Sequence, residues 1–206
     1  MDNKQQYQLA SAACGVLHNL YFHRPNAEFV GQFSDGQMLA AWPQFGDDAA
    51  HQAAISAIQS ALASTDVDGL ERDYYRLFIG PGKMLAYPWG SVYTDRENLL
   101  FADSCQAFNR FCQRWQVQVS LDQHQPLDHI GIMLGILGQL LSNDQQAAVD
   151  ELLTEHLMPW APRMLSCVIE QADSNYYRGF AQLTAQLLQR LMMERGLSAK
   201  QVLLYI

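Results

Sequence analysis

Asp128 and His129 form the pair of neighbouring side chains best suited to chemistry, because a carboxylate can orient an imidazole for proton transfer. Neighbouring helix positions point in different directions, so adjacency in sequence does not by itself let one group serve the other. No serine stands in a recognisable nucleophile motif, and a catalytic triad is recognised only in three dimensions. Three roles stay open for the pair: proton transfer, a cap on a helix beginning near Leu127 beside a core histidine, and contact with a ligand.

A second candidate site is the run Gly80-Pro81-Gly82-Lys83, whose backbone N–H groups and lysine could hold an anion. The Walker phosphate-binding motif requires a glycine five residues before the glycine of its glycine–lysine pair, and a serine or threonine after the lysine. This chain has Leu77 and Met84 at those positions. A nucleotide site at Lys83 and a tight turn are both open, and the turn is the simpler interpretation.

The cysteines and the other histidines give little support for a metal site. The cysteines lie in separate segments without a C-x-x-C pair, and no two histidines are spaced by one helical turn. We therefore expect free, mostly buried thiols and no bound metal. The cysteines are Cys14, Cys105, Cys112 and Cys167.

A long loop separates two helical regions of the sequence. Residues 79–97 read IGPGKMLAYPWGSVYTDRE, and the loop is predicted to extend to about residue 102. Connections in compact domains usually have a handful of residues, so a loop this long that carries Tyr87 and Trp89 must be packed or must bind something. Both interpretations stay open from the spacing alone.

Helical periodicity surrounds this loop and predicts an all-α fold. Residues 117–126 alternate briefly in polarity but end at Pro126, so we predict an extended linker or hinge there rather than a strand. The simplest architecture is a single bundle-like domain over residues 1–206, in which N- and C-terminal halves could be joined near 117–126. Apolar residues recur at helical intervals over residues 4–22, 47–64, 68–78, 103–116, 127–141, 144–158, 163–172 and 175–196.

Charge and hydropathy exclude several classes of partner. The chain has 13 basic and 21 acidic residues, a formal net charge of −8, which opposes generic binding to nucleic acid. The N-terminus lacks the pattern of a secretory signal, so we expect a cytoplasmic protein. The apolar run at residues 130–141 is far shorter than the roughly 20 residues that cross a bilayer. Its glycines, Gly131, Gly135 and Gly138, would instead let a neighbouring helix approach closely.

Four segments together resemble the TorD/DmsD family of redox-enzyme maturation chaperones. The first two are YYRLFIGP at 74–81 and YPWGSVY at 87–93, and the others are QPLDH at 125–129 and HLMPW at 156–160. The order of the first two, followed by Asp-Arg-Glu at 95–97, is most similar to the DmsD branch. The family usually opens the third motif with glutamate, where this chain has Gln125.

This resemblance implies an all-helical fold, no catalytic activity and no cofactor of its own. It also implies a leader-binding surface, on which Asp128 would attract a leader arginine and His129 would bind leader backbone. Trp89 would supply a broad apolar surface with one hydrogen-bond donor. The residues placed on or near this surface are Tyr74, Leu77, Phe78, Pro88, Trp89, Gly90, Ser91, Pro126, Asp128 and His129.

The resemblance implies a cytoplasmic chaperone that binds the twin-arginine signal peptide and the apoprotein of a molybdoenzyme precursor of the DMSO or TMAO reductase type. Such a chaperone would aid cofactor insertion and prevent premature export through the twin-arginine translocase. A leader with a basic start and a short apolar segment suits an acidic receptor. The protein would be a monomer or a domain-swapped oligomer that exchanges at 117–126. The alternative is a small enzyme or nucleotide-dependent switch that uses Asp128, His129 and Lys83.

Overall fold

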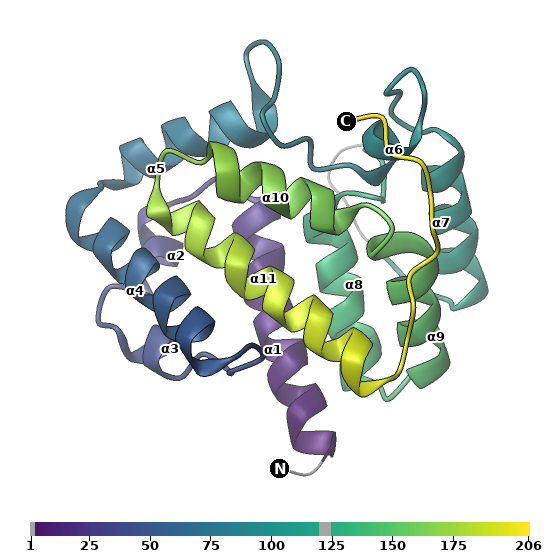
Figure 1. The fold of residues 1–206 in the computed structure, drawn as a ribbon, viewed down its shortest axis with the longest axis horizontal. Helices are drawn as coiled ribbons and strands as arrows, with labels where there is room; N and C mark the ends of the chain where they lie inside the picture. Colours follow the sequence, from purple (N-terminus) through teal and green to yellow (C-terminus); the bar gives the residue numbers. More distant parts are fainter. Residues whose placement is uncertain (1–2, 120–124) are drawn as a thin grey trace. The chain divides into compact units, whose positions relative to one another are not determined.

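The computed structural model describes residues 3–119 and 125–206 (Figure 1). These residues form helices and connecting segments without a named strand, so the predicted all-α fold is confirmed. Residues 120–124, the middle of the predicted hinge, lie outside the described residues. In chain order the elements are α1 (Asn3–Phe22), α2 (Ala27–Gly31), α3 (Gln37–Ala40), α4 (Asp48–Ser64), α5 (Val67–Tyr74), the π-helix η1 (Tyr75–Ile79), α6 (Gly90–Thr94), α7 (Asp103–Arg114), α8 (Ile130–Ser142), α9 (Gln146–Glu151), the π-helix η2 (Leu152–Leu157), α10 (Ala161–Gln171) and α11 (Asn175–Glu194).

The chain divides into two compact units, each assembled from separate stretches of sequence. Unit 1 comprises Met1–Phe22, Pro88–Ala161 and Glu194–Ile206, and unit 2 comprises His23–Tyr87 and Pro162–Met193. The described residues on both sides of the predicted hinge belong to unit 1. The organisation of residues 1–206 as a single domain stays a prediction.

Unit 1 is built on the close packing of α1 against α8. Ser11 Oγ donates to the carbonyl oxygen of Gly138 at 2.8 Å, on the face where these helices meet. A Cβ atom built on Gly131 would lie 2.9 Å from Phe22 Cβ, and one on Gly138 would lie 3.0 Å from Cys14 Cβ. The predicted close approach of a helix to these glycines is therefore confirmed.

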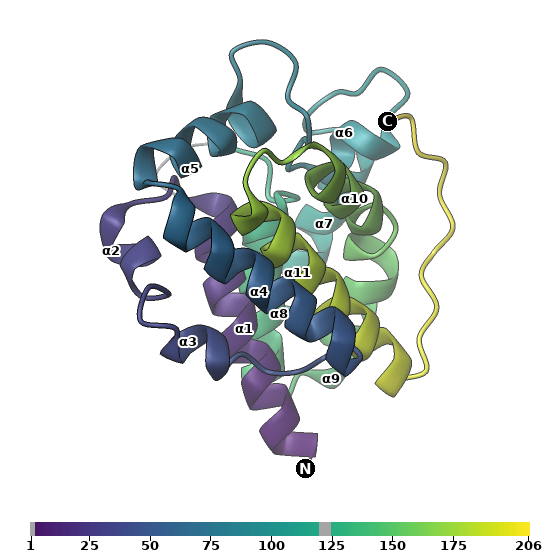
Figure 2. The same cartoon turned by 60° about the vertical axis from the view of Figure 1, so that its left-hand side comes forward.

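Unit 2 packs α4, α5, α10 and α11 around an aromatic core. Figure 2 shows α4 beside α11, where a Cβ on Gly179 would come within 2.6 Å of Ile58 Cγ1. The ring of Phe180 lies edge-on to Phe33 and Trp42, and all three side chains are buried. Burial of these large rings stabilises the unit.

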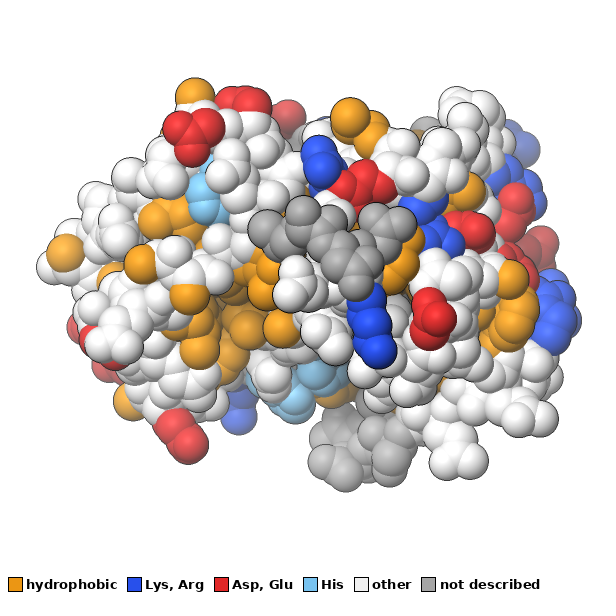
Figure 3. Space-filling view, turned by 90° about the horizontal axis from the view of Figure 1, so that it is seen from below, with side chains coloured by type: hydrophobic (Ala, Val, Ile, Leu, Met, Phe, Trp, Pro, Cys, Tyr) orange, Lys and Arg blue, Asp and Glu red, His pale blue; other side chains and the backbone are white. Residues whose placement is uncertain are grey.

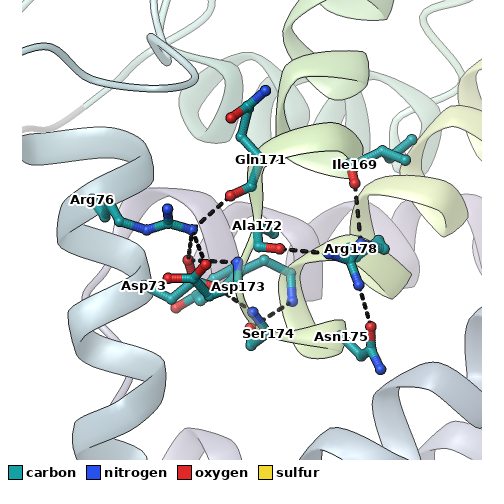
Figure 4. A network of polar contacts seen from close by, with 10 residues as sticks. Asp73, Arg76, Ile169, Gln171, Ala172, Asp173, Ser174, Asn175 and Arg178 are labelled. Carbon is teal, nitrogen blue, oxygen red and sulfur yellow. Dashed lines mark hydrogen bonds and ion pairs between the residues drawn. The ribbon is translucent and has the colours of Figure 1, made fainter.

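A polar network holds the N-terminus of α11 in unit 2 (Figure 4). Asp73 is 3% exposed, and its two carboxylate oxygens accept from different backbone groups: Oδ1 from Asp173 N at 3.1 Å and Oδ2 from Ser174 N at 2.8 Å. Arg76, from the first motif, adds an ion pair with Asp173 at 2.7 Å and donates to the Gln171 carbonyl oxygen at 2.6 Å. The network therefore fixes the end of α5 to the turn before α11.

Several boundaries differ from the sequence prediction. The loop expected over 79–102 contains a short helix, α6, and the helix expected from residue 127 begins at Ile130. The predicted helices 68–78 and 144–158 change to π-helical hydrogen bonding part-way, at η1 and η2. Hydrophobic periodicity did not predict these features. The helix α6 is too short to show a period, and a shift from i+4 to i+5 hydrogen bonding changes the period only slightly.

Two further observations bear on partners. Within the described ranges, no helix combines the length and apolar character needed to span a membrane. On the face seen in Figure 3, the Lys and Arg side chains of described residues are interspersed with Asp and Glu and do not form a continuous basic area. A face without a continuous basic area is expected for a chain whose formal net charge is −8.

Candidate functional site

In unit 1 the second and third sequence motifs meet through backbone hydrogen bonds. Trp89 and His129 form an isolated antiparallel bridge between residues 88–91 and residues 128–130. The two segments are therefore held in a fixed register, although more than 30 positions separate them in sequence. The flanking hydrogen bonds run from Gly90 N to Asp128 O at 3.0 Å and from Ile130 N to Pro88 O at 2.7 Å.

Asp128 supports this junction with its side chain. Its Oδ2 atom accepts from the backbone N–H of Ser91 at 2.5 Å, and the residue is only 2% exposed. Asp128 thus caps α6 (Gly90–Thr94) rather than a helix beginning near Leu127. Burial raises the pKa of the Asp128 carboxyl above its ordinary value, and the hydrogen bonds from Ser91 oppose that rise without cancelling it.

The second carboxylate oxygen of Asp128 faces a less polar environment. Oδ1 has no conventional hydrogen-bond partner among the described residues. The Cys105 thiol lies close enough for the two groups to influence each other's pKa. Burial, with a smaller contribution from the Asp128 charge, raises the pKa of Cys105 to about 12. This thiol is therefore protonated at neutral pH and is not a nucleophile.

His129 caps the helix that follows it. Its Nδ1 atom accepts from Gly131 N at 3.1 Å, at the start of α8, and the residue is 5% exposed. The imidazole packs edge-on against Trp89, with ring centroids 5.5 Å apart, and against Phe22 at 5.3 Å. These contacts favour a structural role for the imidazole, which holds Trp89 in place.

Trp89 is the aromatic side chain of this junction that is open to a ligand. It is half-buried, whereas Pro88, Gly90 and Ser91 beside it are buried. Its indole Nε1 is buried and has no hydrogen-bond partner among the described residues. Because this N–H is buried, a ligand would meet the other, apolar atoms of the half-buried indole rather than its donor.

The fourth motif supports the same site from the other side. Trp160 is 2% exposed, donates from Nε1 to the His156 carbonyl oxygen at 2.8 Å and stacks on Tyr93 at 5.7 Å between centroids. It also lies directly against Gly90. Trp160 therefore packs next to the end of η2 and forms one side of the candidate site.

Replacing Gly90 with alanine is expected to lower the free energy of unfolding by about 2 kcal/mol, because overpacking a closed site carries a cost of this order. A Cβ at this position would lie 2.5 Å from Trp160 Nε1, and the indole is fixed by its hydrogen bond and its stacking. The measurement is urea unfolding. Gly15→Ala in α1 is the matched control, since nothing lies within 4 Å of its added Cβ, and it should be neutral or stabilising.

A pocket of about 360 Å³ opens next to this junction. Gly90 and Asp128 line it from the bridge, and Trp160 contributes an apolar wall. The remaining walls come from α6, α7, α9, η2 with Pro159 after it, and the segment after α11. The charged lining residues are Arg110, Arg114, Asp128, Glu151, Glu155 and Lys200.

The other predicted site residues are distributed over the two units. Tyr74, Leu77 and Phe78 belong to unit 2, where each is at most 2% exposed and packs in the core. Pro126 is buried in unit 1. Lys83 is exposed in the loop of unit 2 and belongs to no pocket described above. Of the predicted residues, the structure therefore brings together Pro88, Trp89, Gly90, Ser91, Asp128 and His129.

Glu155 and Lys200 were not predicted as site residues, although both line the pocket. Glu155 directly precedes the fourth motif, so its position next to that motif was the available signal. Lys200 lies in a stretch without helical periodicity, and sequence patterns gave no reason to place it near residue 90.

Comparison with known proteins identifies the family. The sequence model for the nitrate reductase delta subunit matches residues 45–166. The Tat proofreading chaperone DmsD of Salmonella typhi is 33% identical over 172 residues, which cover 82% of this chain and 81% of the relative. The chain belongs to the TorD/DmsD family.

Other TorD/DmsD relatives agree with this assignment. The chaperone protein TorD of Shewanella pealeana is 26% identical over 188 residues, covering 86% of this chain and 85% of the relative. The crystal structure of a proposed redox enzyme maturation protein from Archaeoglobus fulgidus has the same fold, with a TM-score of 0.55 at 18% identity, over 92% of this chain and 94% of the other. The predicted resemblance is confirmed. As a TorD/DmsD protein, the chain is a chaperone rather than an enzyme.

Proposed function

We propose that this chaperone binds the twin-arginine leader of a redox-enzyme precursor at the junction of Pro88–Ser91 with Asp128–Ile130. The observation that carries the proposal is the bridge between Trp89 and His129, which fixes a half-buried indole beside a pocket lined by three carboxylates and three basic side chains. The names of the DmsD relatives, Tat proofreading chaperones, support the same class of ligand.

The chemistry of the site matches the two parts of such a leader. The apolar segment of the leader would pack on Trp89 and the wall formed by Trp160. A leader arginine would pair with Glu155, because the carboxylate of Glu155 is more exposed than that of Asp128. Asp128 is buried and already accepts from Ser91 N. Asp128 would therefore act on the leader mainly by holding the two segments together.

The proposed client and the place where it is bound follow from the family. The client would be a molybdenum reductase catalytic subunit of the DMSO or TMAO type, bound in the cytoplasm as apoprotein until its cofactor is inserted. Release would then pass the leader to the twin-arginine translocase. The protein would work as a monomer or as a domain-swapped oligomer that exchanges near 117–126.

Trp89→Ala is expected to weaken leader binding at least tenfold, about 1.4 kcal/mol, because the truncated aromatic is the central apolar anchor. The measurement is calorimetric titration of the purified chain with leader peptides from the host's molybdoreductase precursors. Circular dichroism would check that wild type and variant are equally folded.

Trp115→Ala is the control, because Trp115 is another half-buried tryptophan of unit 1 and lies outside the junction of Pro88–Ser91 with Asp128–Ile130. Its Nε1 donates to Glu151 of the pocket at 3.0 Å, so the loss of leader affinity in Trp115→Ala should be clearly smaller than in Trp89→Ala. Equal leader affinity of wild type and Trp89→Ala would contradict the assignment of this site. Saturable nucleotide binding that is lost in Lys83→Ala would instead favour a nucleotide-dependent switch.

A further inference from the structure

The last stretch of the described chain, residues 197–206, runs in extended form along unit 1 and is here called the tail (Figure 1, yellow). It reads LSAKQVLLYI and contains no helix. Lys200 and Val202 of the tail line the pocket that also contains Gly90, Asp128 and Trp160. The tail thus forms one wall of the candidate leader site.

Two backbone hydrogen bonds attach the tail at places where a helix lacks its own donor. Lys200 N donates to the carbonyl oxygen of Thr154 at 2.9 Å. In the π-helical pattern of η2 the donor for this oxygen would be residue 159, which is a proline and has no N–H. The tail therefore supplies a hydrogen bond that the helix cannot make.

The second attachment follows the same logic at α6. Tyr205 N donates to the carbonyl oxygen of Tyr93 at 2.9 Å. The donor four residues further on would be Glu97 N, which instead binds Asp95 Oδ1 at 2.9 Å. If the tail moved away, the two carbonyl oxygens would lose these donors, and the backbone of another extended peptide could supply them.

A charged contact lies between these attachments and the rest of the pocket. Lys200 Nζ is 3.2 Å from Glu155 Oε2, and both side chains are about half exposed. An ion pair this exposed holds the tail only weakly. Val202, Leu203 and Tyr205 are also exposed, and Leu197, Leu204 and Ile206 are only partly buried, so the tail has no fully buried apolar side chain. A segment with so few buried contacts opens more easily than the core beneath it.

The tail and a twin-arginine leader have the same order of residues, a basic part followed by an apolar part. In the tail a lysine is followed by five apolar residues out of six, and in a leader a basic start is followed by an apolar segment. With the tail in place the pocket is lined by three cations and three carboxylates, and without Lys200 by two cations and three carboxylates. Burial lowers the pKa of His156, so this lining residue adds no charge at neutral pH. The uncovered pocket is therefore the better receptor for a cation.

We infer that the tail is an intramolecular competitor, which occupies the place of the leader's basic end and must leave before the leader binds fully. The inference rests on the proposed function, and it adds a means of tuning leader affinity to the chain itself. Only molecules with the tail open bind the leader fully, so the apparent Kd is the Kd of the open form divided by the fraction of molecules that are open.

The test compares the full chain with a chain ending at Gly196, using a fluorescent leader peptide and a fluorescent decapeptide of the tail sequence. We expect the shortened chain to bind the leader about fivefold to tenfold more tightly, which corresponds to closure of the tail in 80–90% of molecules. The decapeptide should bind the shortened chain better than the full chain, and unlabelled leader should displace it.

A second variant keeps the whole chain in case the deletion impairs folding. Lys200→Glu removes the attraction to Glu155, so it should also tighten leader binding, and the gain should shrink at high salt. Lys4→Glu, at an exposed lysine of α1, is the control with the same change in net charge.

The outcomes separate the two proposals. If leader affinity is equal in the full and shortened chains, or if decapeptide and leader bind together, the competitor role is wrong while leader binding stands. If no chain binds a leader, the proposed function fails and the competitor role fails with it.

Discussion

Asp73→Ala is expected to lower the free energy of unfolding by about 3 kcal/mol, the loss typical of removing a buried charged acceptor from two donors. Asp73 accepts from Asp173 N and Ser174 N with separate oxygens, and the Ser174 N–H is buried just before α11. The ion pair to Arg76 adds little, because that guanidinium is 40% exposed. Urea unfolding measures the loss.

Asp73→Asn distinguishes this explanation from a simple loss of charge. An asparagine has one carbonyl oxygen, so its NH2 group would face one of the two backbone N–H donors. We expect most of the destabilisation to remain in this variant. Asp68→Asn, at an exposed position of α5, is the control and should change stability by less than about 0.5 kcal/mol. A stable Asp73→Asn variant would show that the cap at α11 does not need both oxygens.

Asp128→Ala is expected to lower the free energy of unfolding by about 2 kcal/mol, because it leaves the buried Ser91 N–H without its acceptor. It should also abolish measurable leader binding, since Trp89 loses the junction that fixes it. Asp128→Asn should behave differently, because only one carboxylate oxygen is used and an amide oxygen can replace it. Its stability at pH 7 should be within about 1 kcal/mol of wild type or higher.

The pH dependence of this difference has a definite sign. Burial raises the pKa of Asp128 in the folded state, so the folded chain holds that proton more firmly than the unfolded chain. The contribution of Asp128 to stability is therefore fully present below its unfolded pKa and falls as pH rises from about 4 through the folded pKa. Unfolding measured from pH 4 to 7 should show Asp128→Asn gaining on wild type as pH increases. An opposite slope would mean that the carboxylate is stabilised as an anion.

Periodicity predicted the long helices well, because a buried face of α1, α4 or α7 repeats every three or four residues. The short helix α6 could not be predicted from local pattern, since its cap is Asp128, 37 positions beyond Ser91. The π-helices η1 and η2 were not predicted, for a different reason. A shift in hydrogen-bond partner changes few side-chain environments.

For the site, the motifs predicted which residues matter more clearly than how each one acts. The resemblance placed Asp128 and Trp89 on one surface, and the structure brings them within one junction. It did not indicate that Asp128 is buried while Trp89 is partly open, because burial at the junction depends on side chains from other segments, such as Phe22 against His129 and Trp160 against Gly90. The position of the tail could not be predicted, because it is attached through backbone acceptors such as Thr154 O, and these do not depend on the type of side chain.

Unit 1 draws on three stretches of sequence, and this has a consequence for synthesis on the ribosome. No growing chain contains the whole unit until residues beyond 194 have been made, although α1 is made long before them. Contacts between such distant stretches form late, because the long intervening chain must first be closed into a loop. The leader site should therefore mature only after residues 194–206 have been made. A nascent copy of this chaperone would not compete with finished copies for precursors.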